Sequence, residues 1–109
     1  MKIFYPDIKE QNEFKKYGEQ FRKIFADDEK HIYVFSRNNT DYEVIQGVKK
    51  KNPDGNIVYA YPSSEQFGSY GYYITGRNKD YAYDRICYRL EGFDEDVCKE
   101  FKNTVKTLS

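Results

Sequence analysis

Apolar residues in the first quarter of the chain recur at helical spacing. Pro6 and Asp7 precede them as a helix start would, and Glu10 follows Asp7 at the distance of a capping box. The stripe then advances in steps of three and four through Phe14, Tyr17, Gly18, Phe21, Ile24 and Phe25. This pattern predicts an amphipathic N-terminal helix of about four turns that ends near Phe25.

The middle of the chain instead favours strands, because β-branched and aromatic residues alternate there with polar ones. Four strands are expected, at His31–Ser36, Asp41–Lys49, Asn56–Tyr61 and Tyr70–Thr75. Turn-forming residues separate them, including an Asn-Pro-Asp-Gly run before the third strand and the polar loop Pro62–Gly68 before the fourth. Connections this short predict a four-stranded antiparallel meander.

Two helices are expected at the C-terminal end. Residues Asp80–Glu91 fit either a strand or a helix, and the helical template fits better, with Asn78 or Asp80 as its cap. A second helix follows Asp94, whose acidic neighbours suit a helix N-terminus. The sequence therefore predicts a single α+β domain over residues 1–109: an N-terminal helix, a four-stranded antiparallel β-meander and two C-terminal helices on one sheet face.

Composition narrows the functional classes. Lys and Arg number 18 and Asp and Glu number 18, and this balance argues against nucleic acid as the main partner. The chain has no apolar run long enough for a membrane span and begins with no apolar signal core. We therefore expect no membrane association and a cytoplasmic location.

Catalytic chemistry has little support in the sequence. His31 is the single histidine and lies beside three acids, which is typical of a solvated surface residue. Cys87 and Cys98 fall on apolar helix stripes, where packing is the ordinary role of a thiol. No ligand spacing suits zinc, and no Gly-rich turn suits a phosphate. A non-catalytic protein without a metal or cofactor is expected.

Tyrosine is the most informative residue type. The chain has 12 tyrosines, and five of them lie between Asn56 and Thr75. Some rings must fill the core of a protein without tryptophan, yet this number exceeds what one core easily hides, and exposed tyrosine favours protein interfaces. We therefore expect a protein partner to bind a Tyr-rich sheet face and its loop. The candidate binding residues are Tyr59, Tyr61, Phe67, Tyr70, Tyr72 and Arg77.

Two alternatives remain open. Residues Ser69–Ile74 partly resemble the RNP1 signature of RRM domains, which implies stacking of single-stranded RNA on sheet aromatics, with Ile3–Tyr5 as the partner strand. Gly68 and Ser69 depart from that signature, which has a basic residue and a glycine there. A small aromatic or nucleotide ligand is the other alternative. By analogy of composition, short charged domains rich in Tyr, Lys and Asn suggest a phage or mobile-element inhibitor of a host enzyme or defence system.

Overall fold

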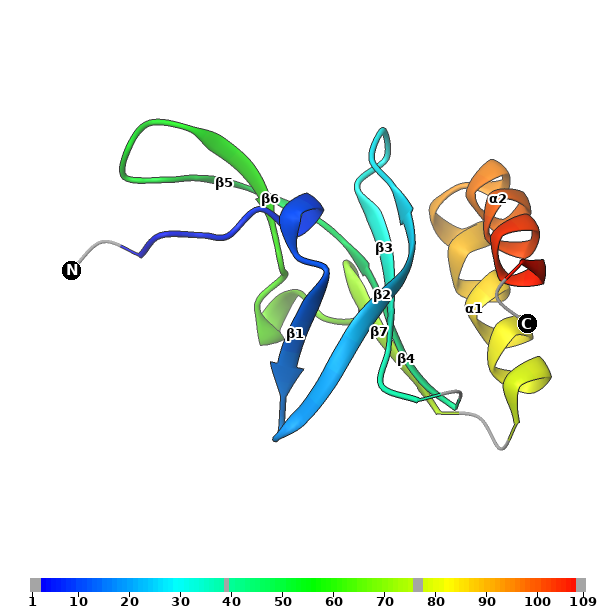
Figure 1. Ribbon diagram of the computed structural model, residues 1–109. Coiled ribbons are helices and arrows are strands. Elements are labelled where there is room, and N and C mark those ends of the chain that lie inside the picture. Colours follow the sequence, from blue (N-terminus) through cyan, green and yellow to red (C-terminus); the bar gives the residue numbers. More distant parts are fainter. Residues whose placement is uncertain (1–2, 39, 76–77, 108–109) are drawn as a thin grey trace.

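The fold is α+β, with a five-stranded antiparallel main sheet, a separate two-stranded sheet and two C-terminal helices. The computed structural model describes residues 3–38, 40–75 and 78–107. Five strands form the main sheet in the order β1-β2-β3-β4-β7. They are β1 (Glu13–Lys16), β2 (Glu19–Asp27), β3 (Ile32–Ser36), β4 (Asp41–Gln46) and β7 (Gly71–Thr75). Two further strands, β5 (Val48–Lys51) and β6 (Ile57–Ala60), pair with each other and project from the sheet as an arm (Figure 1).

Both C-terminal helices are confirmed. They are α1 (Lys79–Phe93) and α2 (Glu95–Lys106), and they cover one face of the main sheet (Figure 1). The Asn78 side chain accepts a hydrogen bond from the Tyr81 N–H, and Asp94 caps α2 by accepting from the Asp96 N–H. No described helix is long and apolar enough to cross a membrane.

The predicted N-terminal helix is wrong. Asp7 caps only a single 3-10 turn, η1 (Ile8–Glu10), and a β-hairpin of β1 and β2 follows. Tyr17 and Gly18 have φ values of 52° and 78°, which is the left-handed pair that a two-residue hairpin turn requires. In β2 a bulge between Lys23 and Phe25 shifts the register. The side chains of Lys23 and Phe25 therefore point to opposite faces of the sheet, although residues two apart in a regular strand share a face.

Turn and bulge together explain the misleading helical spacing. Phe21 packs in the core on the face away from the helices, whereas Phe25, four residues later, packs in the core beneath them. A regular strand would put both rings on one face. Steps of three and four therefore arise here from a hairpin whose second strand contributes to two cores.

The predicted meander is also wrong in its connections. The expected strand Asp41–Lys49 breaks at Gly47, between β4 and β5. A Cβ atom on Gly47 would lie 2.8 Å from the Tyr59 Cβ and 3.0 Å from the Ile8 Cγ2, so the chain can make this close approach only with glycine. Beyond Gly47 the chain leaves the main sheet, and β6 pairs with β5 while β7 pairs with β4.

Each face of the sheet has its own core. The helix-side core lies under α1 and α2 and includes Val34, Val44 and Ile86. The second core lies on the other face, and its buried members are Ile8, Phe21, Tyr33, Phe35 and Ile45. The rings of Phe14, Tyr59, Tyr61 and Phe67 pack against it and are half-buried. Several of the chain's aromatic residues are thus used to cover the second face.

Candidate interaction site at the edge of the sheet

The structure divides the candidate binding residues into two groups. Tyr59, Tyr61 and Phe67 are half-buried on the second core. The Tyr59 ring stacks on His31 with 3.4 Å between ring centroids and 9° between planes. Tyr70 and Tyr72 are exposed, by 40% and 39%. Arg77 lies outside the described residues.

Tyr73 is exposed by 43% and was not among the residues selected from the sequence. Neighbouring residues of a strand point to opposite faces, so Tyr72 and Tyr73 lie on different sides of the sheet. The Tyr72 ring lies 5.4 Å from the Arg89 Cζ of α1, whereas the Tyr73 ring lies 6.4 Å from that of Phe21 in the second core. The two tyrosines therefore flank the edge of the sheet, one on each face.

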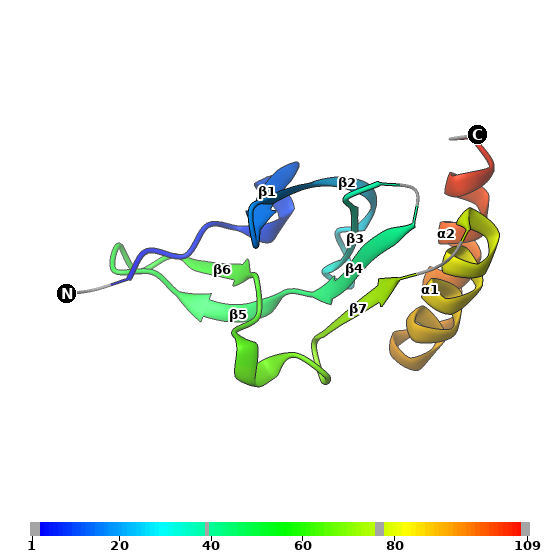
Figure 2. The same ribbon diagram turned by 90° about the horizontal axis from the view of Figure 1, so that it is seen from below.

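Strand β7 forms this edge. Among the described strands it pairs only with β4, and Figure 2 shows it along one margin of the sheet. The Gln46 N–H donates to the Tyr70 C=O at 2.6 Å, and the Gly68 N–H donates to the Gly71 C=O at 2.8 Å from the opposite side. Backbone groups alternate in direction along an antiparallel strand, so the N–H and C=O groups of Tyr73 and Thr75 point away from β4. Within the described part of the chain no residue bonds them, so they form an open row of donors and acceptors.

The residues of β7 do little to protect this edge. Its sequence, Gly-Tyr-Tyr-Ile-Thr, contains no charge and no proline, whereas β1 at the opposite edge reads Glu-Phe-Lys-Lys. Charged side chains and short length are the usual means by which a protein keeps other strands from pairing with an edge. Edge β1 has that protection and β7 lacks the charges.

A cavity of about 390 Å³ lies beside β7 on the helix side, and we call it the helix-side cavity. Its lining residues are Tyr72, Arg85, Tyr88, Arg89, Glu91 and Gly92. Arg89 Nη2 donates to the Gly68 C=O at 2.9 Å and so ties α1 to the loop before β7. Among the described residues Arg85 makes no hydrogen bond or ion pair, and the Tyr88 ring is 74% exposed.

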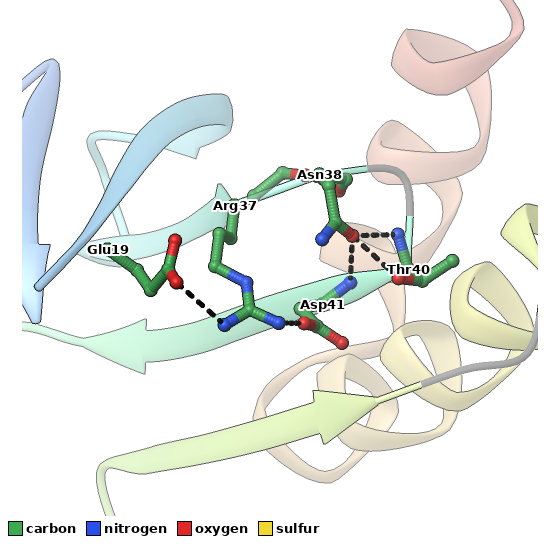
Figure 3. Close-up of polar contacts among 6 residues, drawn as sticks. Glu19, Arg37, Asn38, Thr40 and Asp41 are labelled. Atoms are coloured by element: carbon green, nitrogen blue, oxygen red, sulfur yellow. Dashed lines mark hydrogen bonds and ion pairs between the residues drawn. The ribbon is translucent and has the colours of Figure 1, made fainter. Parts of the chain in front are cut away.

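A second cavity, of about 400 Å³, lies on the other face between the β1–β2 turn and β7, and we call it the hairpin-side cavity. Its lining residues are Lys16, Tyr17, Glu19, Phe21, Arg37, Phe67 and Tyr73. Arg37 pairs with Asp41 and lies 3.8 Å from Glu19 (Figure 3). Asn38 Oδ1 accepts from the Thr40 and Asp41 N–H groups and holds the turn that carries Arg37 (Figure 3).

Lys16, the other cation of the hairpin-side cavity, is also paired. Its Nζ lies 2.5 Å from Oε1 of Glu43, a fully buried residue of β4, and 4.4 Å from the centroid of the Phe67 ring. The Tyr61 hydroxyl donates to the other Glu43 oxygen at 2.5 Å. Burial, then this hydrogen bond, and then the charge of Glu43 raise the pKa of the Tyr61 phenol. The hairpin-side cavity therefore presents aromatic rings to solvent while its cations are already neutralised.

Within the described ranges no group of three His, Cys, Asp or Glu residues could hold a metal ion. The segment Ile3–Tyr5, expected as the partner strand of an RRM-like sheet, forms no strand. What the site offers is an unpaired strand edge with one aromatic cavity on each side.

Of the residues predicted from the sequence, Tyr72 and Phe67 line the two cavities, whereas Tyr73, Tyr88 and Tyr17 line them without having been predicted. The stripe Tyr81, Arg85, Tyr88 at steps of four and three along α1 was a usable signal, because those positions lie opposite the buried face of Ala82 and Ile86. Tyr17 could be placed only once its segment was known to be a turn. Compared with known proteins, the chain matches no family model, no curated protein and no solved structure.

Proposed function

We propose that this protein is a non-catalytic binding protein that captures an extended segment of a protein partner by adding it as a strand to β7. The observation that carries the proposal is the open row of backbone groups at Tyr73 and Thr75. In strand addition, main-chain hydrogen bonds supply affinity and pockets for alternate side chains supply specificity. β7 offers both, because Tyr72 and Tyr73 each border a cavity on one face.

Residue types at the site support a protein partner. Tyrosine and arginine are enriched among the residues that dominate protein interfaces, and Tyr72, Tyr88 and Arg85 lie together on the helix side. Tyr59 and Tyr61 then have a supporting role, since they pack against the second core, whereas Phe67 also forms a wall of the hairpin-side cavity. Inhibition of a host enzyme, by occupying one of its exposed segments, stays a prediction on this proposal.

Stacking of single-stranded RNA is the competing proposal, and the geometry favours it less. Stacking platforms place successive bases on aromatic rings that share one face of a sheet. Tyr72 and Tyr73 lie on opposite faces, the exposed Tyr70 lies in the turn before β7, and Tyr59 and Tyr61 are half-buried. Oligonucleotide binding that weakens steeply with salt and is lost on Tyr72→Ala would favour RNA over a peptide.

Selection from a library of random 12-residue peptides displayed on phage tests the proposal. Synthetic versions of the selected peptides should slow amide hydrogen exchange at Tyr73 and Thr75, because strand addition satisfies their outward groups. Thr75→Pro deletes one outward donor and should weaken binding about tenfold, the cost of roughly one unmade hydrogen bond. Thr75→Ala keeps that donor and is the matched control. Selected peptides that leave exchange at Tyr73 and Thr75 unchanged would overturn strand addition.

A further inference from the structure

The two cavities beside β7 differ in chemistry, and this difference specifies the captured segment. We infer that the segment carries an aromatic residue directly next to an acidic one. The aromatic ring enters the hairpin-side cavity beside Tyr73, and the carboxylate lies in the helix-side cavity at Arg85. This inference rests on the strand addition proposed above and adds the side-chain chemistry of the partner.

Adjacency follows from strand geometry. A residue that pairs directly opposite another in a sheet points its side chain to the same face. The partner residue opposite Tyr73 therefore points into the hairpin-side cavity, and the one opposite Tyr72 points into the helix-side cavity. Because Tyr72 and Tyr73 are consecutive, the two partner residues are consecutive as well.

The hairpin-side cavity suits an uncharged aromatic ring. Tyr17, Phe21, Phe67 and Tyr73 supply its walls. Its two cations are paired with carboxylates, Lys16 with Glu43 and Arg37 with Asp41, so an acidic partner side chain would gain no free counter-ion there. An aromatic ring gains both apolar burial and edge-to-face contacts with such walls.

The helix-side cavity suits an acid. Its charged lining residues are Arg85, Arg89 and Glu91, which leaves one positive charge in excess. Arg89 already donates to the carbonyls of Gly68 and Ser69 and lies over the Tyr72 ring. Among the described residues neither arginine forms an ion pair, and Arg85 makes no hydrogen bond either, so we assign Arg85 as the cation that pairs with a carboxylate from the segment.

The order of the two residues reports the direction of the added strand. If the segment runs antiparallel to β7, its aromatic residue opposite Tyr73 comes first and its acid opposite Tyr72 comes next. If the segment runs parallel to β7, the acid comes first and the aromatic residue comes next. Tyr73 exchanges both an N–H and a C=O with one residue only in the antiparallel case. Two peptides that differ solely in this order therefore distinguish the two directions.

Fluorescence anisotropy with four labelled nine-residue peptides tests the inference. All share one Ser/Thr/Val host, and the first two carry Phe-Glu or Glu-Phe at the centre. The third and fourth keep the better order but replace Glu by Lys, or Phe by Ser. Each is titrated against wild type, Arg85→Glu, Tyr17→Asn and Thr75→Pro, with thermal unfolding as the check on folding. Tyr17→Asn removes a cavity wall yet keeps a residue that favours the left-handed turn conformation.

The better acidic peptide should bind wild type about three- to tenfold more tightly than its Lys counterpart, as expected for reversal of a solvent-accessible ion pair. Arg85→Glu should invert that order. Replacing Phe by Ser should weaken binding at least about fivefold, and Tyr17→Asn should weaken the Phe peptides without affecting the Ser peptide.

The outcomes separate the inference from the proposal beneath it. Equal binding of all four peptides, with Tyr73 amide exchange slowed and binding weakened about tenfold in Thr75→Pro, would overturn the inference and leave strand addition standing. Binding that ignores Thr75→Pro, or no binding up to about 1 mM, would overturn both. A wild-type dimer that dissociates on Thr75→Pro would show β7 occupied by a second copy, and this too would overturn the inference.

Discussion

Lys16 and Glu43 form an ion pair between strands that are not neighbours in the sheet. Lys16 ends β1 and Glu43 lies in β4, and β2 and β3 separate the two strands. The pair can form only because the β1–β2 hairpin bends over the second core, where Tyr61 donates to the same carboxylate. The contact therefore holds Lys16, a lining residue of the hairpin-side cavity, in place.

Removing one partner of this pair should be costly. Lys16→Met leaves the fully buried Glu43 carboxylate without its cation, and we expect the free energy of unfolding to fall by about 2–4 kcal/mol, because Lys16 itself is partly exposed. The double variant Lys16→Met/Glu43→Leu should recover part of that loss. Urea unfolding measures both, with Lys15→Met at an exposed neighbouring position as the control. A loss no larger than the control's would show that the pair does not stabilise the fold.

Two glycines should respond in opposite ways to replacement by alanine, because one lies in the β1–β2 turn and the other lies in α1. Gly18 has a φ of 78°, so Gly18→Ala should lower the free energy of unfolding by about 1–2 kcal/mol although no atom obstructs the new methyl group. Gly92 lies inside α1 with open space around it, and Gly92→Ala should raise the same quantity by about 0.5–1 kcal/mol. Thermal or urea unfolding of the two variants checks the signs, and equal signs would contradict the turn described here.

Gly47 tests the break between the sheet and the arm. An added Cβ would meet Tyr59 and Ile8 at 2.8 and 3.0 Å, and the first of these contacts is with a Cβ that cannot move without the backbone. We expect Gly47→Ala to lower the free energy of unfolding by about 1–3 kcal/mol through overpacking. Gly92→Ala again serves as the control. A value within about 0.5 kcal/mol of wild type would mean that the arm can shift freely at this point.

Local signals in the sequence predicted local structure well. Asn78 and Asp94 cap the two helices that the apolar stripes indicated, because a cap depends on residues three or fewer positions away. The N-terminal segment failed for a related reason. Apolar residues at steps of three and four satisfy a helix, and they equally satisfy a hairpin whose turn residues, Tyr17 and Gly18, are left-handed and whose second strand is bulged. Within this stripe Gly18 was the residue that favours a turn over a helix interior.

The site was less predictable, because a strand forms an edge only when no other strand pairs with its outer side, and this depends on the arrangement of the whole sheet. Exposure of Tyr72 could be expected from the surplus of tyrosine, but the partial burial of Tyr59 and Tyr61 depends on their packing against the second core, whose residues lie far away in the sequence. β7 pairs with β4 and not with β6 because the chain leaves the main sheet at Gly47. Gly47 in turn lies against Tyr59 and Ile8, which are distant from it in the sequence. No local pattern encodes such a pairing.

The buried thiol of Cys87 should react slowly. Burial, followed by a hydrogen bond with Cys98, raises the pKa of the Cys87 thiol to about 12, so very little thiolate exists near neutral pH. We expect alkylation by iodoacetamide at about pH 8 to be at least about 100-fold slower in the native protein than in urea. Mass spectrometry of the proteolytic peptides that contain Cys87 and Cys98 follows the alkylation of each thiol. Native-state labelling of Cys87 at the rate of the unfolded chain would place it at the surface instead.

Alkaline pH should destabilise the protein through its buried phenols. Burial first, and then the hydrogen bond to Glu43, raise the pKa of Tyr61 above the unfolded value of about 10, so the folded state holds this proton more tightly. The resulting stabilisation is complete below about pH 10 and is lost as the pH rises toward the folded-state pKa. Above about pH 10 the wild type should release one more proton on unfolding than Tyr61→Phe, so the unfolding free energy of the variant should fall less steeply with pH. At neutral pH the variant should be less stable than wild type, because Glu43 loses a hydrogen-bond donor.

Urea unfolding at a series of pH values between about 8 and 11 measures both effects of Tyr61→Phe. Tyr88→Phe is the control, because it also removes one phenolic hydroxyl but at a ring that is 74% exposed. The pH profile of Tyr88→Phe should follow the wild-type profile. If Tyr61→Phe and Tyr88→Phe gave the same slope, the Tyr61 hydroxyl would not be held by Glu43, and Lys16 alone would be left to pair with that carboxylate.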